Sequence, residues 1–140
     1  MLRKDELDLL NALLTPFEEK RQKDKGYHLG GMCVMVSFVA AKILTEEKFR
    51  NTEWRFQRGR YGVGLGANEE YLDGHCWIVS CDGSIILDLT ADQFGRDRIY
   101  FGPATSNYIT VKDDFTEPYD TGFYEPARNA YIACRTAQRA

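Results

Sequence analysis

The sequence predicts an α+β fold in which a buried helix packs against an antiparallel sheet. Residues 33–44 are apolar on nearly every face, which is typical of a helix at the centre of a domain. Residues 75–80 and 84–90 alternate well enough for two strands, and Asp82-Gly83 between them is the strongest local signal of a β-hairpin. The fold class rests on this central helix and this hairpin.

A single domain over residues 1–140 is expected, because a chain of this length can bury a core of its own. Apolar residues make up 44% and charged residues 28%, a balance that argues against a disordered chain. No apolar stretch reaches the roughly 18 residues of a membrane helix, and MLRKDELDLL has acidic residues where a secretory signal places its apolar core. We therefore expect a cytoplasmic protein with no membrane partner. The net charge of −3 also argues against nucleic acid as a partner.

The chain opens with a predicted amphipathic helix from Asp5, its expected N-cap, and Pro16 is expected to kink or end this helix. The apolar stripe of the helix consists of Leu7, Leu10, Leu14 and Phe17. Residues 21–31 are charged and then glycine-rich, which predicts a surface loop that approaches a site. The helix over 33–44 follows, with Cys33 in its first turn.

The rest of the chain is predicted to be mostly strands. Residues 52–57 alternate well enough for a strand, and the glycine-rich residues 58–74 predict a flexible loop or lid before the hairpin. Two further short strands are predicted at 98–103 and 107–112. The residues after Pro126 are predicted to be helical, with frayed ends.

The hairpin is expected to bring a histidine and a carboxylate together. With a two-residue turn, Trp77 faces Asp88 and His75 faces Thr90 across the two strands. Because side chains alternate along a strand, these four residues point to the same side. His75 and Asp88 are then diagonal neighbours, roughly 7–8 Å apart at the backbone, a gap that an imidazole and a carboxylate can close with a hydrogen bond.

Cys33 is the candidate that gives such a pair a chemical use. A carboxylate orients an imidazole, and the imidazole takes a proton from a nucleophile. A thiol at the start of a helix feels the positive end of the helix macrodipole, which favours the thiolate. The adjacent Gly30-Gly31 lets a substrate backbone come close, and the Cys33 amide is placed to bind an oxyanion.

This order of residues resembles the transglutaminase-like core of the papain-like cysteine fold. The resemblance rests on a cysteine that starts a buried helix, then GHCW at 74–77, an apolar strand, a turn and ILDLT at 86–90. Trp77 matches the tryptophan that the family carries two residues after its histidine. The resemblance covers roughly residues 28–90.

The resemblance implies a role for each of three residues. Cys33 would be the nucleophile, His75 the general base and acid, and Asp88 the carboxylate that orients the histidine. Two positions depart from the family pattern: Leu89 stands where proline is frequent, and Cys76 where alanine is common. Neither is expected to touch the three catalytic residues.

Four residues are candidates for contact with substrate. Trp77 is one, and Gln93 would lie at the rim of the cleft, just past the second hairpin strand. Tyr27 and His28 are candidates for the donor that completes the oxyanion hole, as is Gln22 further upstream. A helix start or a tight turn in TADQFG is the plainer explanation for Gln93.

Each catalytic candidate also has a structural explanation. Cys33 can be a buried structural thiol, His75 a satisfied histidine at a strand end, and Asp88 a cap at the end of a strand. A metal centre is not expected, because Cys76 faces away from His75 and Cys81 lies at the far end of the hairpin.

The predicted function is cysteine-dependent acyl transfer through a Cys33 thioester. Its simplest form is hydrolysis of an amide in a peptide or protein, by a thiol protease, amidase or deamidase, with no metal or cofactor. One alternative is a toxin or effector that acts as a transglutaminase or deamidase on a host protein. The other is a non-catalytic module that holds a peptide in the same cleft.

Overall fold

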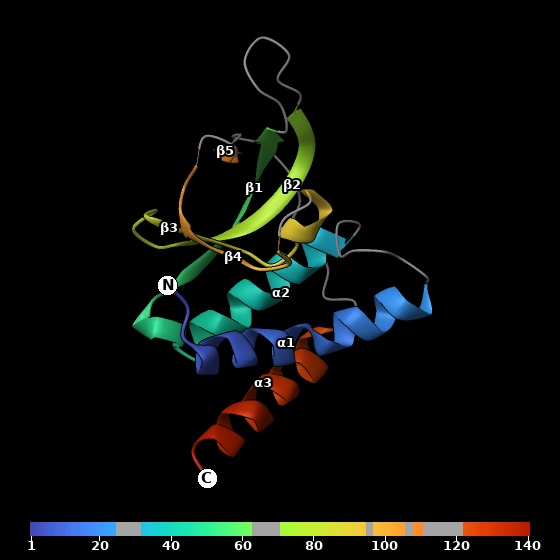
Figure 1. The fold of residues 1–140 in the computed structure, drawn as a ribbon, viewed down its shortest axis with the longest axis vertical. Helices are drawn as coiled ribbons and strands as arrows, with labels where there is room; N and C mark the ends of the chain where they lie inside the picture. The colour runs from blue at the N-terminus through green and yellow to red at the C-terminus, as the bar shows by residue number, and fades with distance from the viewer. Residues whose placement is uncertain (25–31, 63–70, 95–96, 106–107, 111–121) are drawn as a thin grey trace.

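The computed structural model describes residues 1–24, 32–62, 71–94, 97–105, 108–110 and 122–140, without the side chains of 71–74 and 93–94 (Figure 1). In chain order the elements are α1 (Lys4–Lys23), α2 (Cys33–Glu46), η2 (Phe49–Asn51), β1 (Trp54–Gly62), β2 (Tyr71–Ser80), β3 (Ile85–Asp88), η4 (Ala91–Phe94), β4 (Tyr100–Pro103), β5 (Tyr108–Thr110) and α3 (Tyr124–Gln138).

The five strands form one antiparallel sheet in the order β4-β3-β2-β1-β5. The three α-helices in the described part of the chain gather on one side of this sheet (Figure 1). α2 lies against β1 and β2, whereas α1 and α3 pack on each other beyond it. The α+β class expected from the sequence is confirmed at this level. Among the described helices, none combines the length and the apolar character needed to cross a bilayer.

The sheet curls so strongly that its two edges meet. A flat sheet would hold the outer strands β4 and β5 about 19 Å apart, which is four spacings of ~4.8 Å. Instead, the Tyr100 ring on β4 stacks on the Tyr108 ring on β5 with their centroids 5.7 Å apart. The concave face of the sheet is filled by a cluster of Tyr61, Trp77, Ile86 and Tyr108, with Tyr100 against it.

The main core lies between the other face of the sheet and the helices. Ile78 and Leu87 enter it from the strands, and Leu10 and Phe17 enter it from α1. The buried residues of α2 are Cys33, Val36, Ser37, Val39, Ala40, Ala41, Ile43 and Leu44. Burying one large aliphatic side chain stabilises a fold by about 1.5–3 kcal/mol, so packing fixes the position of α2. The prediction of a central helix is confirmed.

The predicted register of the hairpin is also confirmed. The observed pairs are Ile78 with Leu87 and Val79 with Ile86. The ladder stops there, because β3 ends at Asp88 and the chain then turns away toward η4. The expected backbone pairs of Trp77 with Asp88 and of His75 with Thr90 are therefore not made. The side chains of His75 and Asp88 meet across the opening between the strands.

α1 differs from the sequence prediction in three respects. It begins one residue before Asp5, so Asp5 lies in the first turn and not at the N-cap. It runs through Pro16, because a proline removes a single helical hydrogen bond and the helix is buried on both sides of it, at Leu14 and at Phe17. Leu7 is 38% exposed and lies outside the buried stripe. That stripe consists of Leu9, Leu10, Leu13, Leu14 and Phe17.

The prediction of one long loop over 58–74 is wrong. β1 continues to Gly62 and β2 begins at Tyr71, with an irregularity in the pairing after Gly59. Glycine is uncommon inside strands, so the glycines here suggested a loop. Gly59 is nevertheless within β1, where its lack of a side chain lets neighbouring strands lie close together, as described below. The remainder of the expected lid, 63–70, lies outside the described residues.

The remaining elements follow the prediction with shifted ends. The short strands expected at 98–103 and 107–112 are present as β4 and β5. α3 begins two residues before Pro126, because a first-turn proline costs a helix no hydrogen bond.

Candidate active site

Cys33 is the first residue of α2 and faces β2. Cys33 is 8% exposed, so only a small part of it is open to solvent. One turn further along the helix, the Ser37 hydroxyl donates a hydrogen bond to the carbonyl oxygen of Cys76 on β2, at 3.2 Å. Residues one turn apart share a helix face, so this bond sets Cys33 against the same part of β2.

His75 lies on β2 and is 3% exposed. Its Nε2–H donates to Asp88 Oδ2 at 2.7 Å, the short distance of a charge-assisted hydrogen bond. The contact between the two side chains that the hairpin register predicted is therefore present. Because Nε2 is hydrogen-bonded to Asp88, Nδ1 is the ring nitrogen available to exchange a proton with Cys33.

Asp88 is fully buried, and four donors satisfy its carboxylate. Oδ1 accepts from the Thr90 backbone amide at 3.0 Å and from the Thr90 hydroxyl at 3.3 Å. Oδ2 accepts from His75 and from the Tyr108 hydroxyl at 2.8 Å. The sequence indicated Thr90 as a neighbour but gave no sign of Tyr108, which approaches only because the sheet curls.

The surroundings of His75 favour its protonated form. Burial by itself would lower the pKa of the imidazole. The hydrogen bond to Asp88 and the contact with Cys33 outweigh burial and raise the pKa of His75 to about 9. His75 is thus an imidazolium at neutral pH.

The pKa of Cys33 is shifted in the opposite direction. Hydrogen bonds from the Cys76 thiol and from His75, together with the charge of the imidazolium, lower the pKa of the Cys33 thiol to about 5, although burial opposes the shift. Between about pH 5 and about pH 9, Cys33 and His75 therefore form a thiolate–imidazolium pair. A thiolate is the nucleophilic form of cysteine.

The prediction that Cys76 does not touch the catalytic residues is wrong. Cys76 does point to the opposite face of β2 from His75, as alternation requires, but this is the face that α2 and Cys33 cover. Its thiol contacts Cys33, and the negative sulfur of Cys33 raises the pKa of Cys76, as burial does. Cys76 therefore stays a thiol and acts as a hydrogen-bond donor.

The four candidate substrate contacts have different outcomes. Trp77 is 1% exposed, and its indole lies against His75 and Tyr108 with ring centroids 5.7 and 5.1 Å away. It supports the histidine from the concave face and offers no surface to a substrate. Gln93 lies in η4, so the expected helix start is confirmed, but its side chain lies outside the described residues. Tyr27 and His28 lie outside them altogether.

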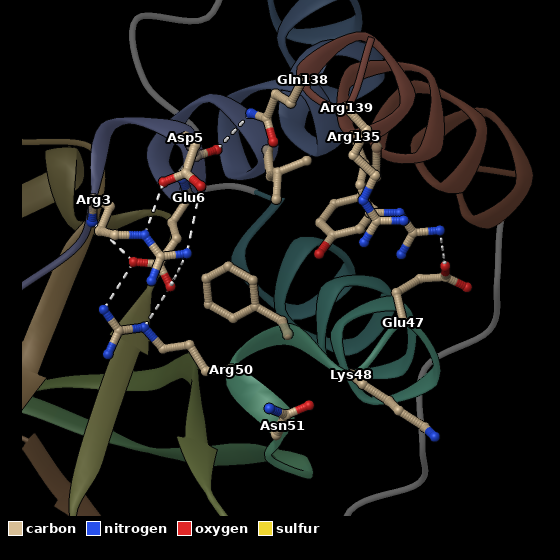
Figure 2. A pocket seen from close by; sticks show the side chains of 13 residues that line it. Arg3, Asp5, Glu6, Glu47, Lys48, Arg50, Asn51, Arg135, Gln138 and Arg139 are labelled. Atoms are coloured by element: carbon tan, nitrogen blue, oxygen red, sulfur yellow. Dashed lines mark hydrogen bonds and ion pairs between the residues drawn. The ribbon is translucent and has the colours of Figure 1, made fainter.

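A hollow of about 420 Å³ lies at the other end of α2, between α1, η2 and α3 (Figure 2). Ion pairs cross or border it: Arg3–Asp5 at 3.0 Å, Arg50–Glu6 at 2.7 Å and Arg135–Glu47 at 2.7 Å. The Arg50–Glu6 and Arg135–Glu47 pairs join the two terminal helices to the segment after α2, so the hollow has a structural explanation. Across the described residues, no three histidine, cysteine or acidic side chains are grouped to hold a metal ion.

Comparisons with protein-family models, with curated proteins and with solved structures each found no match to this chain.

Proposed function

We propose that this chain is a cysteine-dependent acyl-transfer enzyme that hydrolyses an amide through a thioester on Cys33. The proposal includes the transglutaminase-like form of the papain-like core that the sequence resembles. One observation carries it: a buried line of contacts from Cys33 to His75 and from His75 to Asp88, with the second bond at 2.7 Å. A structural thiol needs neither an imidazole nor a buried carboxylate behind it.

The chemistry follows from the charge state of the pair. The Cys33 thiolate attacks an amide carbonyl, the new C–S bond forms, and the carbonyl oxygen becomes an oxyanion. His75 gives its proton to the leaving amine as the C–N bond breaks, which leaves a thioester and a neutral imidazole. His75 then takes a proton from water, the hydroxyl attacks the thioester, and the acid product leaves with Cys33 again a thiolate.

Two other groups support these steps. Asp88 holds the His75 ring and stabilises its positive charge, so that Nδ1 stays directed at Cys33. The amide of Cys33 is the oxyanion donor that we propose, because it lies next to the attacking sulfur at the positive end of α2.

The substrate class that we propose is a peptide or protein. Hydrolysis is preferred over transamidation because water needs no binding site of its own, whereas an amine acceptor does. A toxin or effector that modifies a host protein would use the same residues, and a peptide-binding module would keep the fold without the reaction.

The test is to incubate the protein with a peptide library in water labelled with heavy oxygen, in the presence of a biotinylated primary amine. Protease activity places heavy oxygen at new C-termini, deamidase activity places it at former glutamines or asparagines, and transamidation attaches biotin. We expect one of the first two products from the wild type and none from Cys33→Ala.

The matched control is Cys81→Ala, which removes an exposed thiol on the hairpin turn and should retain the activity. Product formation by Cys33→Ala at the wild-type rate would contradict the proposal. Retention of specific peptides by the wild type without any product would instead indicate the binding module.

A further inference from the structure

The proposed reaction leaves one buried group at the site without a covalent role, the thiol of Cys76. Register places its side chain on the α2 face of β2, beside Ile78, which packs into the main core. The hydrogen bond from Ser37 to the Cys76 carbonyl holds the start of α2 to this residue. The side chains of Cys33 and Cys76 are hydrogen-bonded to each other. All four cysteines of the chain are free, so this contact joins two reduced sulfur atoms.

The two thiols differ in access and in charge. Cys33 is 8% exposed, whereas Cys76 is fully buried. Cys33 carries the negative charge, stabilised by His75, and Cys76 keeps its proton. Arg58 pairs with Cys76 across β1 and β2, and its positive charge also acts on the Cys76 sulfur. A reachable thiolate with a protonated thiol in contact is the arrangement of a reactive cysteine and its resolving partner.

We propose that Cys33 is a site of reversible oxidation, at which a hydroperoxide oxidises Cys33 and Cys76 resolves the product as a Cys33–Cys76 disulfide. Contact between the two side chains, the burial of Cys76 and the access to Cys33 carry this assignment. Neither residue needs to leave its element, because α2 and β2 already hold the two sulfur atoms together.

The steps balance with the hydroperoxide as the only oxidant. The Cys33 thiolate attacks the terminal oxygen of the peroxide, an S–O bond forms, the O–O bond breaks, and the departing alkoxide takes the His75 proton to become an alcohol. Cys33 is then a sulfenic acid. The Cys76 sulfur attacks the Cys33 sulfur, an S–S bond forms, and the S–O bond breaks. The leaving hydroxide takes the Cys76 proton and departs as water.

The disulfide would protect Cys33 from irreversible oxidation to the sulfinic acid. It would also occupy the sulfur atom that acyl transfer requires. That second consequence rests on the proposed function, whereas the disulfide itself does not.

The test uses hydrogen peroxide in slight excess on the full chain, with no substrate present, followed by non-reducing digestion and mass spectrometry. We expect the wild type to lose two hydrogen atoms in mass and to yield one linked peptide pair that contains Cys33 and Cys76. Iodoacetamide labelling of Cys33 should be lost after peroxide and should return after dithiothreitol. A wild-type chain whose Cys33 gains two or three oxygen atoms while Cys76 stays reduced would overturn the proposal.

Two variants sharpen the result. Cys81→Ser combined with Cys134→Ser removes the two cysteines outside the site, and the linked pair should form as in the wild type. Cys76→Ser should let Cys33 take up oxygen atoms that dithiothreitol does not remove. Loss of the link in the Cys81/Cys134 double variant would assign it to other thiols and would also overturn the proposal. Because no substrate is used, a chain that links but hydrolyses no amide would refute only the proposed function.

Discussion

At the scale of single residues, the central feature is a buried carboxylate with a full set of hydrogen-bond donors. An unpaired charge at the 0% exposure of Asp88 would be costly. Thr90 satisfies one oxygen, and His75 and Tyr108 satisfy the other. Tyr108 thereby fixes the oxygen that holds the histidine, which makes it a positioning residue in the proposed site.

Tyr108→Phe should lower the free energy of unfolding by about 1.5–3 kcal/mol, because a buried carboxylate loses a hydrogen bond while the aromatic ring remains. Chemical denaturation monitored by tryptophan fluorescence measures this change. Iodoacetamide labelling of Cys33 at neutral pH should also slow, because His75 is held less firmly.

Tyr100→Phe is the matched control for this prediction. Tyr100 stacks on Tyr108, but its hydroxyl donates to the Pro103 carbonyl in an exposed place. This control should cost less stability and leave Cys33 labelling unchanged. Equal effects of the two substitutions would mean that the Tyr108 hydroxyl contributes nothing specific to Asp88.

At the scale of the elements, the site depends on how closely β1 lies against the Trp77 ring. A Cβ atom at Gly59 would lie 2.6 Å from Cη2 of Trp77, and closer still to the backbone carbonyl oxygen of Ile109 on β5. Real Cβ atoms do not come this close to other atoms. Glycine is therefore required at this point of β1, where it pairs with His75 on one side and Thr110 on the other.

Gly59→Ala should destabilise the chain by about 1–3 kcal/mol, the usual cost of overpacking. It should also lower the reactivity of Cys33, because Trp77 and β5 must shift away from His75. Gly102→Ala on β4 is the control: its nearest contact would be the flexible Tyr100 hydroxyl, at 3.1 Å. A Gly59→Ala chain as stable as the Gly102→Ala chain would contradict the close packing described for β1.

The elements themselves were largely predictable from local patterns. The apolar run at 33–44 gave α2, and the turn signal at Asp82-Gly83 gave the register of the hairpin and with it the His75–Asp88 contact. The predicted ends of elements were wrong where a glycine or a proline lies inside an element because of packing against other elements. Gly59 lies within β1, and Pro16 lies within α1 because Leu14 and Phe17 on either side of it are buried.

At the scale of the whole molecule, the candidate site is assembled from parts far apart in the sequence. α2 supplies Cys33, the hairpin supplies His75 and Asp88, and β5 supplies Tyr108 from the far edge of the sheet. The curl that brings β5 to β3 depends on the packing of several aromatic rings, and no local sequence pattern reports it. The Cys33–Cys76 contact was missed for a related reason. Strand alternation predicted which face of the sheet the Cys76 side chain is on, but it could not predict that α2, with Cys33, covers that face.

This assembly exists only in the folded chain, so the low pKa of Cys33 must be lost on unfolding. The most direct measurement is the pH dependence of iodoacetamide labelling at Cys33, followed by peptide mass spectrometry in the wild type and in His75→Ala. Exposed Cys81 in the same sample is the internal reference, and a sample in denaturant reports the unfolded chain.

Labelling of wild-type Cys33 is expected to stay high at neutral pH and to fall as the pH drops through about 5, where the thiolate is protonated. In His75→Ala and in denaturant, the midpoint should move toward the ~8.5 of an ordinary thiol. A Cys33 that labels with the same midpoint in all three samples would contradict the thiolate–imidazolium pair, and with it the proposed acyl transfer.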